Sequence, residues 1–449
     1  MDLIYDHSAL ILLLETHNFR ELRRELAEMN EVDIALFIET LEPENMVLCF
    51  RTLPKQMASD VFSEFETETQ QIIIESINDQ ELSVIVEDLF VDDAVDMLEE
   101  LPASVVKRVL KNATPATRSL INQFLKYPEN SAGSIMTAEF TDLGGTMTVA
   151  DAIAHIRRTA NDRETIYTCY VVNNTRTLEG VVTVKDLLLA PDGMRVDDLM
   201  DRDVIFVSTL EDQEEVAHLF SRYGLLTVPV VDHEHRLVGI VTVDDAITVM
   251  EQETTEDFEV MGGIHPSEKP YLKTGVLLHA KNRITWLLVL MISGMVTGSI
   301  LGKFEHAISA MPLLVTFIPM LTGTGGNSGS QSSTLIIRGM AVSEIVPRDL
   351  LAVFWKELRV SLIVGIVLGI VNFFRLIITY PGNEMIALVV SLTMLCVIVI
   401  AKTIGGVLPM LTKVVGADPA IMAAPLLTTI VDAAALLVYF AIALRLLPL

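Results

Sequence analysis

One aspartate stands near the middle of a long apolar segment close to the C-terminal end of the sequence. Asp432 ends the run Pro425-Leu426-Leu427-Thr428-Thr429-Ile430-Val431-Asp432. A carboxylate at the depth of a bilayer is costly, so its default interpretation is functional. The alternative is a buried structural carboxyl, either protonated or paired with a neighbouring helix. Oxygen ligands without sulfur or imidazole suit hard cations such as Mg²⁺, Ca²⁺ or Mn²⁺.

Other oxygen donors could share a cation with Asp432. Thr428 lies four residues earlier, and a second apolar segment contains a polar run over 322–334. We predict a bend at Gly325-Gly326-Asn327 that offers backbone carbonyls and an amide oxygen. Asp418 precedes the last segment, where a hydrated interfacial side chain is the stronger interpretation. Because one carboxylate per chain makes a thin site, two copies across a two-fold axis, a homodimer, are expected.

Carboxylates also cluster in the first half of the sequence. Asp92, Asp93 and Asp96 fall within five residues, and a run from Asp244 to Glu259 is predicted to be a long acidic helix. Like charges three or four residues apart on a helix repel each other. Cations would hold such faces together and their removal would separate them, which is the physical basis of a gate. The alternative is an ordinary solvated surface.

The charge is distributed very unevenly. Residues 1–270 contain 52 acidic and 20 basic residues, whereas residues 271–449 contain 7 acidic and 12 basic residues. The negative first part argues against a nucleic-acid partner, whose phosphates need Lys and Arg, and favours cations. Three distant cysteines suggest no zinc site or disulfide framework, and the N-terminus does not resemble a signal peptide.

Five apolar segments are long enough to span a bilayer as helices. They cover residues 284–304, 311–337, 358–380, 385–411 and 420–446. Basic residues cluster before the first, between the second and third, and at Lys402 and Lys413, which we place beside the loop between the fourth and fifth. The positive-inside rule then predicts a multi-pass protein of the plasma or inner membrane, with its N-terminal half in the cytoplasm and its C-terminus outside.

The first half contains two internal repeats. In residues 1–130, predicted to be an all-α helical-repeat domain, Leu53-Pro54 recurs 48 residues later as Leu101-Pro102. Residues 131–195 and 196–248 each contain a helix and two strands, and end in Gly180–Asp186 or Gly239–Asp245. This pair resembles tandem CBS domains, an α/β fold. A connecting helix is predicted over 249–275 and an α-helical transmembrane domain over 276–449.

In CBS domains the closing Thr-x-x-Asp can hold an adenosine ribose. Thr183 and Asp186, with Thr242 and Asp245 in the second repeat, are therefore nucleotide candidates, and ATP is a candidate ligand. Leu225 replaces the aromatic residue that would stack on adenine, which argues against ATP. The simpler interpretation is that each Thr and Asp caps the helix that follows.

The order of these parts resembles the MgtE family of magnesium transporters over essentially the whole chain. The resemblance rests on the acidic helical domain, the CBS pair, the polar Gly325–Gln331 run, Asp418-Pro419-Ala420 and Asp432. It implies a non-enzymatic homodimer whose pore is lined by the second and fifth spans, with Mg²⁺ as substrate and regulator. The implied regulatory carboxylates are Asp92, Asp93, Asp96, Asp212, Glu214, Asp244, Asp245, Glu253, Glu256 and Asp257. Thr248 and Gly224 replace acids of the family pattern, so at least one sensing site is expected to differ.

Two other functions fit parts of the sequence. A secondary transporter for an anion would use helix N-termini at the polar run, but we find no Lys or Arg in the middle of a span, and Asp432 opposes an anion. A membrane sensor without transport would not need the polar second span. An enzyme would need a catalytic constellation, which the sequence lacks.

Overall fold

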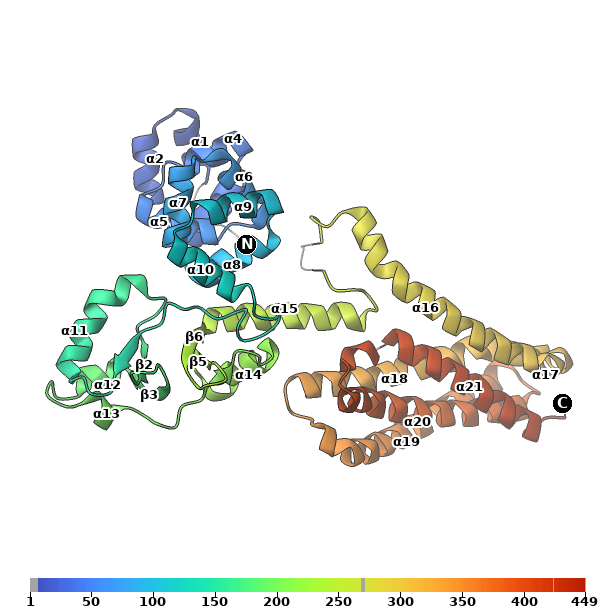
Figure 1. Cartoon of the computed structure of the whole chain (residues 1–449). Helices are drawn as coiled ribbons and strands as arrows, with labels where there is room; N and C mark the ends of the chain where they lie inside the picture. Colours follow the sequence, from blue (N-terminus) through green and yellow to red (C-terminus); the bar gives the residue numbers. More distant parts are fainter. Residues whose placement is uncertain (1–6, 268–270, 423, 449) are drawn as a thin grey trace. The chain divides into compact units, whose positions relative to one another are not determined.

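The computed structural model describes residues 7–267, 271–422 and 424–448. The chain divides into two compact units, Met1–Met250 and Glu251–Leu449, and helix α15 (Val243–Met261) crosses the boundary between them. Figure 1 shows the elements of each unit. The predicted fold class is confirmed: helices come first, two small sheets follow, and long apolar helices complete the chain.

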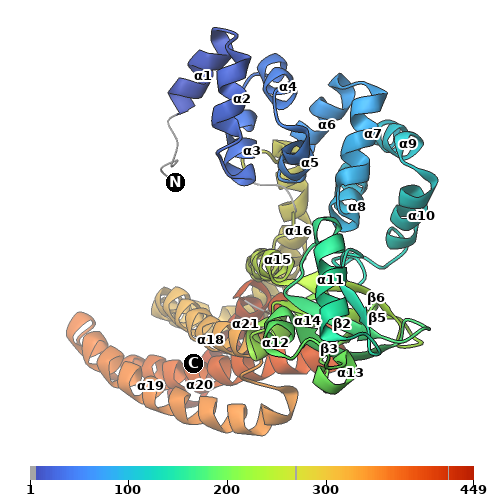
Figure 2. The same ribbon diagram turned by 90° about the vertical axis from the view of Figure 1, so that its left-hand side faces the viewer.

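In the described residues from 7 onward, ten short helices form the first domain and follow one another along the chain (Figure 2). They are α1 (His7–Glu15), α2 (Phe19–Leu26), α3 (Glu31–Glu39), α4 (Pro43–Phe50), α5 (Lys55–Ser63), α6 (Thr67–Ser76), α7 (Asp79–Asp88), α8 (Val91–Glu100), α9 (Ala103–Asn112) and α10 (Pro115–Phe124). Pro54 and Pro102 are the N-cap residues of α5 and α9, as the Leu-Pro repeat predicts. Proline suits a helix start because it lacks the N–H that would have no partner there.

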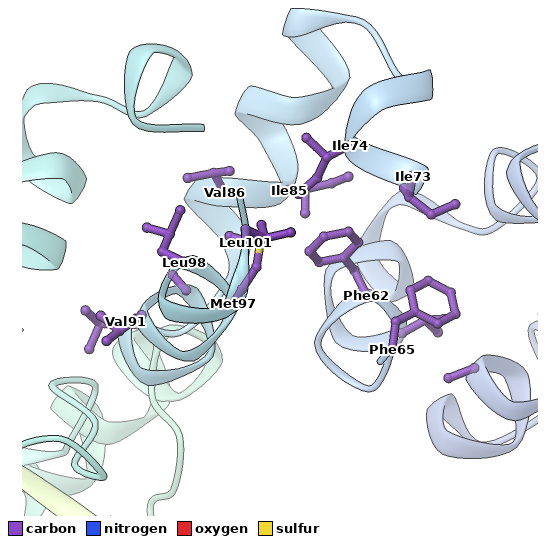
Figure 3. Packing of buried hydrophobic residues seen from close by; sticks show 14 of the residues in the cluster. Phe62, Phe65, Ile73, Ile74, Ile85, Val86, Val91, Met97, Leu98 and Leu101 are labelled. Carbon is purple, nitrogen blue, oxygen red and sulfur yellow. The ribbon is translucent and has the colours of Figure 1, made fainter. Parts of the chain in front are cut away.

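Aromatic and branched side chains fill this core. Phe62 and Phe65 meet edge to face, with ring centroids 6.3 Å apart, and Ile73, Ile74 and Leu98 lie in the same cluster (Figure 3). The cluster continues into the second CBS repeat through Val216, Val228 and Val241, among others. Burial of apolar surface therefore joins the helical domain to that repeat within the first unit.

Each CBS repeat contains a three-stranded sheet. The first has β1 (Asp142–Gly144), β2 (Thr168–Val172) and β3 (Leu178–Thr183), with α11 (Val149–Thr159) and α12 (Val184–Leu189). The short helix α13 (Val196–Leu199) begins where the second repeat was predicted to begin, but its Val196 packs in the core of the first. The second has β4 (Val207–Ser208), β5 (Thr227–Val231) and β6 (Leu237–Thr242), with α14 (Gln213–Tyr223). The first strand of each sheet pairs in parallel with the second, and the second pairs antiparallel with the third. The four predicted strands are confirmed, whereas the two short parallel strands were not anticipated.

Helix α15 ends at Met261, and residues 262–267 and 271–275 are not helical, so the helix predicted over 249–275 is wrong for these residues. Residues 268–270 of that prediction lie outside the described residues. Gly263 follows with a φ of +68°, a left-handed conformation that favours glycine. A Cβ atom at Gly263 would lie 3.3 Å from Pro425 Cγ and 3.7 Å from Trp286 Cγ. The His265 N–H donates to the Asn282 carbonyl at 3.0 Å. The turn after α15 is thus packed against the membrane-type helices of the same unit.

The second unit is a helical bundle (Figure 1). It contains α16 (Val276–Lys303), α17 (Glu305–Ala310), α18 (Ile318–Ala341), α19 (Leu350–Thr379), α20 (Glu384–Val415) and α21 (Ala424–Leu446). Four segments in the described chain are long and apolar enough to cross a membrane: Val276–Lys303, Pro347–Thr379, Glu384–Val415 and Pro419–Leu446. Helix α18 is not among them because of its polar run, so the count of five spans stays a prediction.

The bend predicted at Gly325-Gly326-Asn327 is wrong, because α18 is a continuous helix through these residues. Their carbonyls therefore take part in helical backbone pairing and are not presented by a bend. The glycines instead allow close packing. A Cβ atom at Gly325 would lie 2.6 Å from Val397 and 2.8 Å from Val431, so α18 is packed tightly against α20 and α21. Small residues commonly permit such close approach between membrane helices.

Lys402 does not lie beside a loop, because α20 extends past it to Val415. Its residue surface is only 6% exposed. The sequence-based assignment of Lys402 to a helix end was wrong, since the fourth apolar segment continues as one uninterrupted helix. Lys402 therefore gives no support to the predicted orientation, which now depends on the other basic residues.

The close approach of α18 and α20 gives the first testable prediction. A Cβ atom at Gly405 would lie 2.3 Å from the Gly329 carbonyl oxygen, so Gly405→Ala forces two backbones apart. We expect a loss of about 1–3 kcal/mol, the usual cost of overpacking. Thermal unfolding of the purified protein in detergent measures it. Gly298→Ala on α16 is the matched control, because nothing lies within 4 Å of its added methyl group. Equal unfolding temperatures for both variants would contradict the packing described here.

Candidate functional site

The first candidate site is an acidic surface on α8. This helix buries Val91, Ala94 and Val95 in the domain core and carries Asp92 and Asp93 at the edge of that core, both partly buried. The Asp92 Oδ1 atom is inaccessible to solvent and has no hydrogen-bond partner among the described residues. A buried acceptor without a donor costs free energy, so binding of a proton or a cation at this oxygen would be favourable.

Carboxylates from other segments lie near enough to interact with Asp92 and Asp93 through their charges. Asp93 repels Asp245 at the start of α15, Glu64 at the end of α5, and Glu139 before β1. Asp96 repels Asp93 and Asp245, while Glu164 repels Asp244 and Asp245. The Glu164 N–H donates to the Glu139 carbonyl at 2.9 Å, which brings these two residues together.

We call these residues the acidic cluster: Glu64, Asp92, Asp93, Asp96, Glu139, Glu164, Asp244 and Asp245. Sequence reasoning found Asp92, Asp93, Asp96, Asp244 and Asp245. It missed Glu64, Glu139 and Glu164, which come from separate segments and form no local pattern.

The crowding changes how these carboxyls bind protons. Burial and then repulsion from Asp93 raise the pKa of Asp92 well above its usual range. Burial, followed by repulsion from other acids of the cluster, raises the pKa of Asp93 and that of Glu164 to about 7. Desolvation and like charges both favour the neutral form of a carboxyl. The acidic cluster is therefore poised to take up protons or cations near neutral pH.

The acidic cluster is not a preformed metal centre. Among the described residues, no group of three or more His, Cys, Asp or Glu side chains lies in position to hold a metal ion directly. This geometry is compatible with Mg²⁺, which dehydrates reluctantly and is commonly held through its own water molecules.

The other predicted regulatory residues lie elsewhere. Asp212 caps α14 by accepting from the Glu214 N–H at 2.9 Å, and Glu214 lies 3.6 Å from His218 Nε2. Glu253, Glu256 and Asp257 lie on the part of α15 that belongs to the second unit. These five residues lie on α14 or on the later part of α15 and are not members of the acidic cluster. Their role in cation sensing stays a prediction.

The nucleotide candidates act as helix caps. Thr183 and Asp186 form a reciprocal capping box at the start of α12, and Thr242 donates its hydroxyl hydrogen to Asp245 at the start of α15. This is the simpler of the two interpretations considered for these pairs. Asp245 thus belongs both to a cap and to the acidic cluster.

The second candidate site lies between α18 and α21. Thr428 and Asp432 are four residues apart on α21 and so share a helix face. A Cβ atom at Gly326 would lie 3.0 Å from Thr428 Cγ2, which places this face of α21 directly against α18. Asp432 is partly buried.

Helix α18 presents a polar stripe beside this contact. Gly323, Asn327, Gln331, Thr334 and Arg338 are exposed or partly exposed within the chain's own bundle and recur every three or four residues, so they share one face. Lipid would not solvate such a stripe well, whereas a water-filled pathway would. The polar run found in the sequence thus lines one face of an intact helix.

Asp418 has a different setting. It is exposed, and its Oδ1 accepts from the Ala420 N–H at 2.8 Å, which caps the short 3-10 turn at Pro419–Met422. A cap satisfies backbone donors and so accounts for an acid at this position. A direct role for Asp418 in the pore stays a prediction.

Lys402 lies in the middle of a membrane-type helix, so the expectation that no Lys or Arg lies in the middle of a span is wrong and no longer counts against an anion transporter. Its ammonium group donates to Gln331 and Ser332. The carboxylate of Asp432 still opposes an anion as the transported ion.

Family models match most of the chain. A model described as a divalent cation transporter matches residues 318–442, the MgtE intracellular N domain matches 29–130, and the CBS domain matches 132–193 and 196–252.

Curated relatives align along nearly the full length. The magnesium transporter MgtE of Thermus thermophilus is 36% identical over 434 residues, which cover 96% of each chain. That of Bacillus subtilis is 31% identical over 444 residues, 98% of each chain. Both relatives are named as transporters and not as enzymes.

Two solved structures resemble the first part of the chain. The cytosolic domain of the Mg²⁺ channel MgtE in complex with ATP is 36% identical with a TM-score of 0.52, and it covers 54% of this chain and 100% of that one. The soluble part of a magnesium transporter is 29% identical with a TM-score of 0.53, and it covers 55% and 97%. The relatives, the family models and the shared fold agree, and this chain belongs to the MgtE family of divalent cation transporters.

Proposed function

We propose that the protein carries Mg²⁺ across the cell membrane as a homodimer and that cytoplasmic Mg²⁺ closes it. The observation that carries the transport assignment is Asp432, partly buried on α21 where that helix packs against the glycine face of α18. The polar stripe of α18 supplies a hydrophilic path beside it. Asn327 and Thr428 are the neutral oxygen donors of this pathway.

A homodimer is supported because a single carboxylate per chain supplies few ligands for a divalent cation. Mg²⁺ keeps several waters and is usually bound by one or two carboxylates, so Asp432 from each of two chains would suffice. Helix α16 adds to this, because none of its residues is buried by the rest of its own chain. The N-terminal half then faces the cytoplasm and the C-terminus faces outward, as the remaining flanking basic residues predict.

The pore assignment predicts that Asp432→Asn abolishes transport. The substitution keeps the size of the side chain but removes the charge that attracts the ion, so Mg²⁺ uptake into proteoliposomes should fall at least about 100-fold, or about 2.7 kcal/mol. Glu344→Gln is the control, because Glu344 is an exposed acid in the loop before α19. Uptake by the Asp432→Asn variant at the rate of the control would refute this pore assignment.

Gating follows from the acidic cluster. Without cations its carboxylates repel, which favours separation of the helical domain from the start of α15. Bound Mg²⁺ cancels that repulsion and favours the closed arrangement. A ligand shifts such an equilibrium only through its higher affinity for one state, and a full reversal takes about 5.5 kcal/mol. Several weak sites on many carboxylates can supply this together.

The contact after α15 offers a route from the acidic cluster to the pore. Asp244 and Asp245 lie at the start of α15, and the turn at Gly263 that follows its end packs against Pro425 at the start of α21. Thr428 is three residues farther along. A displacement of α15 would therefore press on the helix that carries Asp432.

Neutralising the cluster should weaken inhibition by cytoplasmic Mg²⁺. For Asp93→Asn we expect the Mg²⁺ concentration that half-inhibits uptake to rise about ten-fold, or about 1.4 kcal/mol, while uptake at low Mg²⁺ is kept. Proteoliposome flux at varied Mg²⁺ on the cytoplasmic face measures this. Glu179→Gln, an exposed acid on β3, is the control. Unchanged inhibition in the Asp93→Asn protein would exclude the cluster as the sensor.

The raised pKa values predict a pH dependence for the soluble part. Between about pH 4 and pH 7 folded Asp93 and Glu164 hold protons that the unfolded chain has released. Stability from these groups is therefore fully present at low pH and is lost as the pH rises through about 7. A fragment of residues 1–261 without Mg²⁺ should melt about 5 °C lower at pH 8 than at pH 5.5.

Added Mg²⁺ should restore the melting temperature at pH 8, where the carboxylates are charged, and should change little at pH 5.5. The double variant Asp93→Asn/Glu164→Gln is the control and should lose most of this pH dependence. A melting temperature that rises from pH 5.5 to pH 8 without Mg²⁺ would contradict the charge assignment.

A further inference from the structure

A buried lysine lies in the membrane-type bundle near the polar stripe of α18. Lys402 of α20 donates from Nζ to Gln331 Oε1 and to Ser332 Oγ, each at 3.4 Å. Ser332, itself 1% exposed, donates its hydroxyl hydrogen to Glu357 Oε2 at 2.6 Å. A hydroxyl has one hydrogen and two lone pairs, so Ser332 can accept from the lysine and donate to the glutamate at once.

We call this chain of Lys402, Ser332 and Glu357 the charge relay. It links three helices, because Ser332 lies on α18, Glu357 on α19 and Lys402 on α20. Lys402 is buried and Glu357 is partly buried. Charged side chains withdrawn from water are tolerated when they are compensated and hydrogen-bonded. Here Ser332 joins the two opposite charges through its hydroxyl group.

The backbone around the charge relay is shaped to fit it. Gly405, three residues after Lys402, approaches the carbonyl of Gly329, three residues before Ser332. A Cβ atom at Gly406 would lie 2.9 Å from Glu357 Cγ, so this glycine leaves room for the glutamate. Close helix packing and the polar contacts therefore coincide at one junction.

The charge relay also reaches the proposed ion path. Gln331, which accepts from Lys402, is one of the exposed residues of the polar stripe. An unbalanced positive charge behind that stripe would repel a passing cation, and an unbalanced negative charge would retain it.

We propose that Lys402, Ser332 and Glu357 are positioning residues for ion transport. They fix α18 against α19 and α20, and the charges of Lys402 and Glu357 balance each other beside the polar stripe. This inference rests on the proposed transport of Mg²⁺.

The test compares the two charges. Lys402→Met leaves Glu357 uncompensated and should lower the Mg²⁺ concentration for half-maximal uptake about three-fold, whereas Glu357→Gln leaves Lys402 uncompensated and should raise it by about as much. Maximal uptake should fall in both variants. The double variant Lys402→Met/Glu357→Gln should return the half-maximal concentration to the wild-type value. Shifts in the same direction, or no shift in either variant, would overturn the proposal. Loss of a purely structural contact would not move the half-maximal concentration in opposite directions in the two variants.

Lys413→Met and Glu344→Gln are matched controls, because they remove exposed charges from α20 and from the loop before α19. Both should leave the half-maximal concentration unchanged, and a shift as large as those of the relay variants would overturn the proposal.

A second measurement separates the charge relay from the transport assignment. Ser332→Ala keeps both charges but removes the hydroxyl that links them. In detergent, the double variant Ser332→Ala/Lys402→Met should therefore lose less thermal stability than the sum of the two single losses. Additive losses would overturn the relay. If the wild-type protein shows no Mg²⁺ flux, the proposed function fails, but this stability cycle still decides whether the three side chains act together.

Discussion

Removing a charge from water costs several kcal/mol unless a partner compensates it, and the arrangement of this chain depends on that constraint. Each of its two units contains charged groups that are wholly or partly withdrawn from solvent. In the first unit the acidic cluster contains Asp93 and Glu164, whose pKa values are raised by burial and repulsion, together with the unpartnered oxygen of Asp92. In the second unit Lys402 is buried, but Ser332 connects it to Glu357.

These two ways of compensating charge distinguish a part of the molecule that can respond to ions from a part that is fixed. The charge relay contains its own compensation, so it stabilises one packing of α18, α19 and α20 whatever the ion concentration. Among the residues that the structure describes, no ion pair joins a base to the acidic cluster, so its stability depends on protons or cations from solution. A sensor needs this dependence, because a site that compensates itself has no reason to respond to a ligand.

Much of the fold could be predicted because its signals are local or repeated. The Gly-x-Val-Thr-Val-x-Asp endings mark both CBS repeats, and the strands Thr227–Val231 and Leu237–Thr242 follow from their apolar sequences. The parallel strands β1 and β4 are only three and two residues long, too short to leave a periodic pattern. The bend at Gly325 was predicted from the polar run within an apolar segment. The helix continues there because glycine's cost in a helix is only about 1 kcal/mol, and the close packing against Val397 and Val431 offsets it.

The candidate site was predictable only where one segment carries the chemistry. Asp432 and the pair Asp92 and Asp93 are visible in the sequence because a charge in an apolar run and a dense acidic run are each unusual. Glu139, Glu164 and Glu357 are ordinary acids in sequence, and only the fold places them beside other charges. Lys402 was misread for a related reason. In sequence it stands near Lys413 and resembles a basic residue that flanks a span. In the structure it lies within a helix and donates to residues 331 and 332, which lie 71 and 70 positions earlier in the chain. Tertiary pairing decides whether a charge anchors a helix end, senses an ion or locks a bundle, and sequence spacing alone does not contain that information.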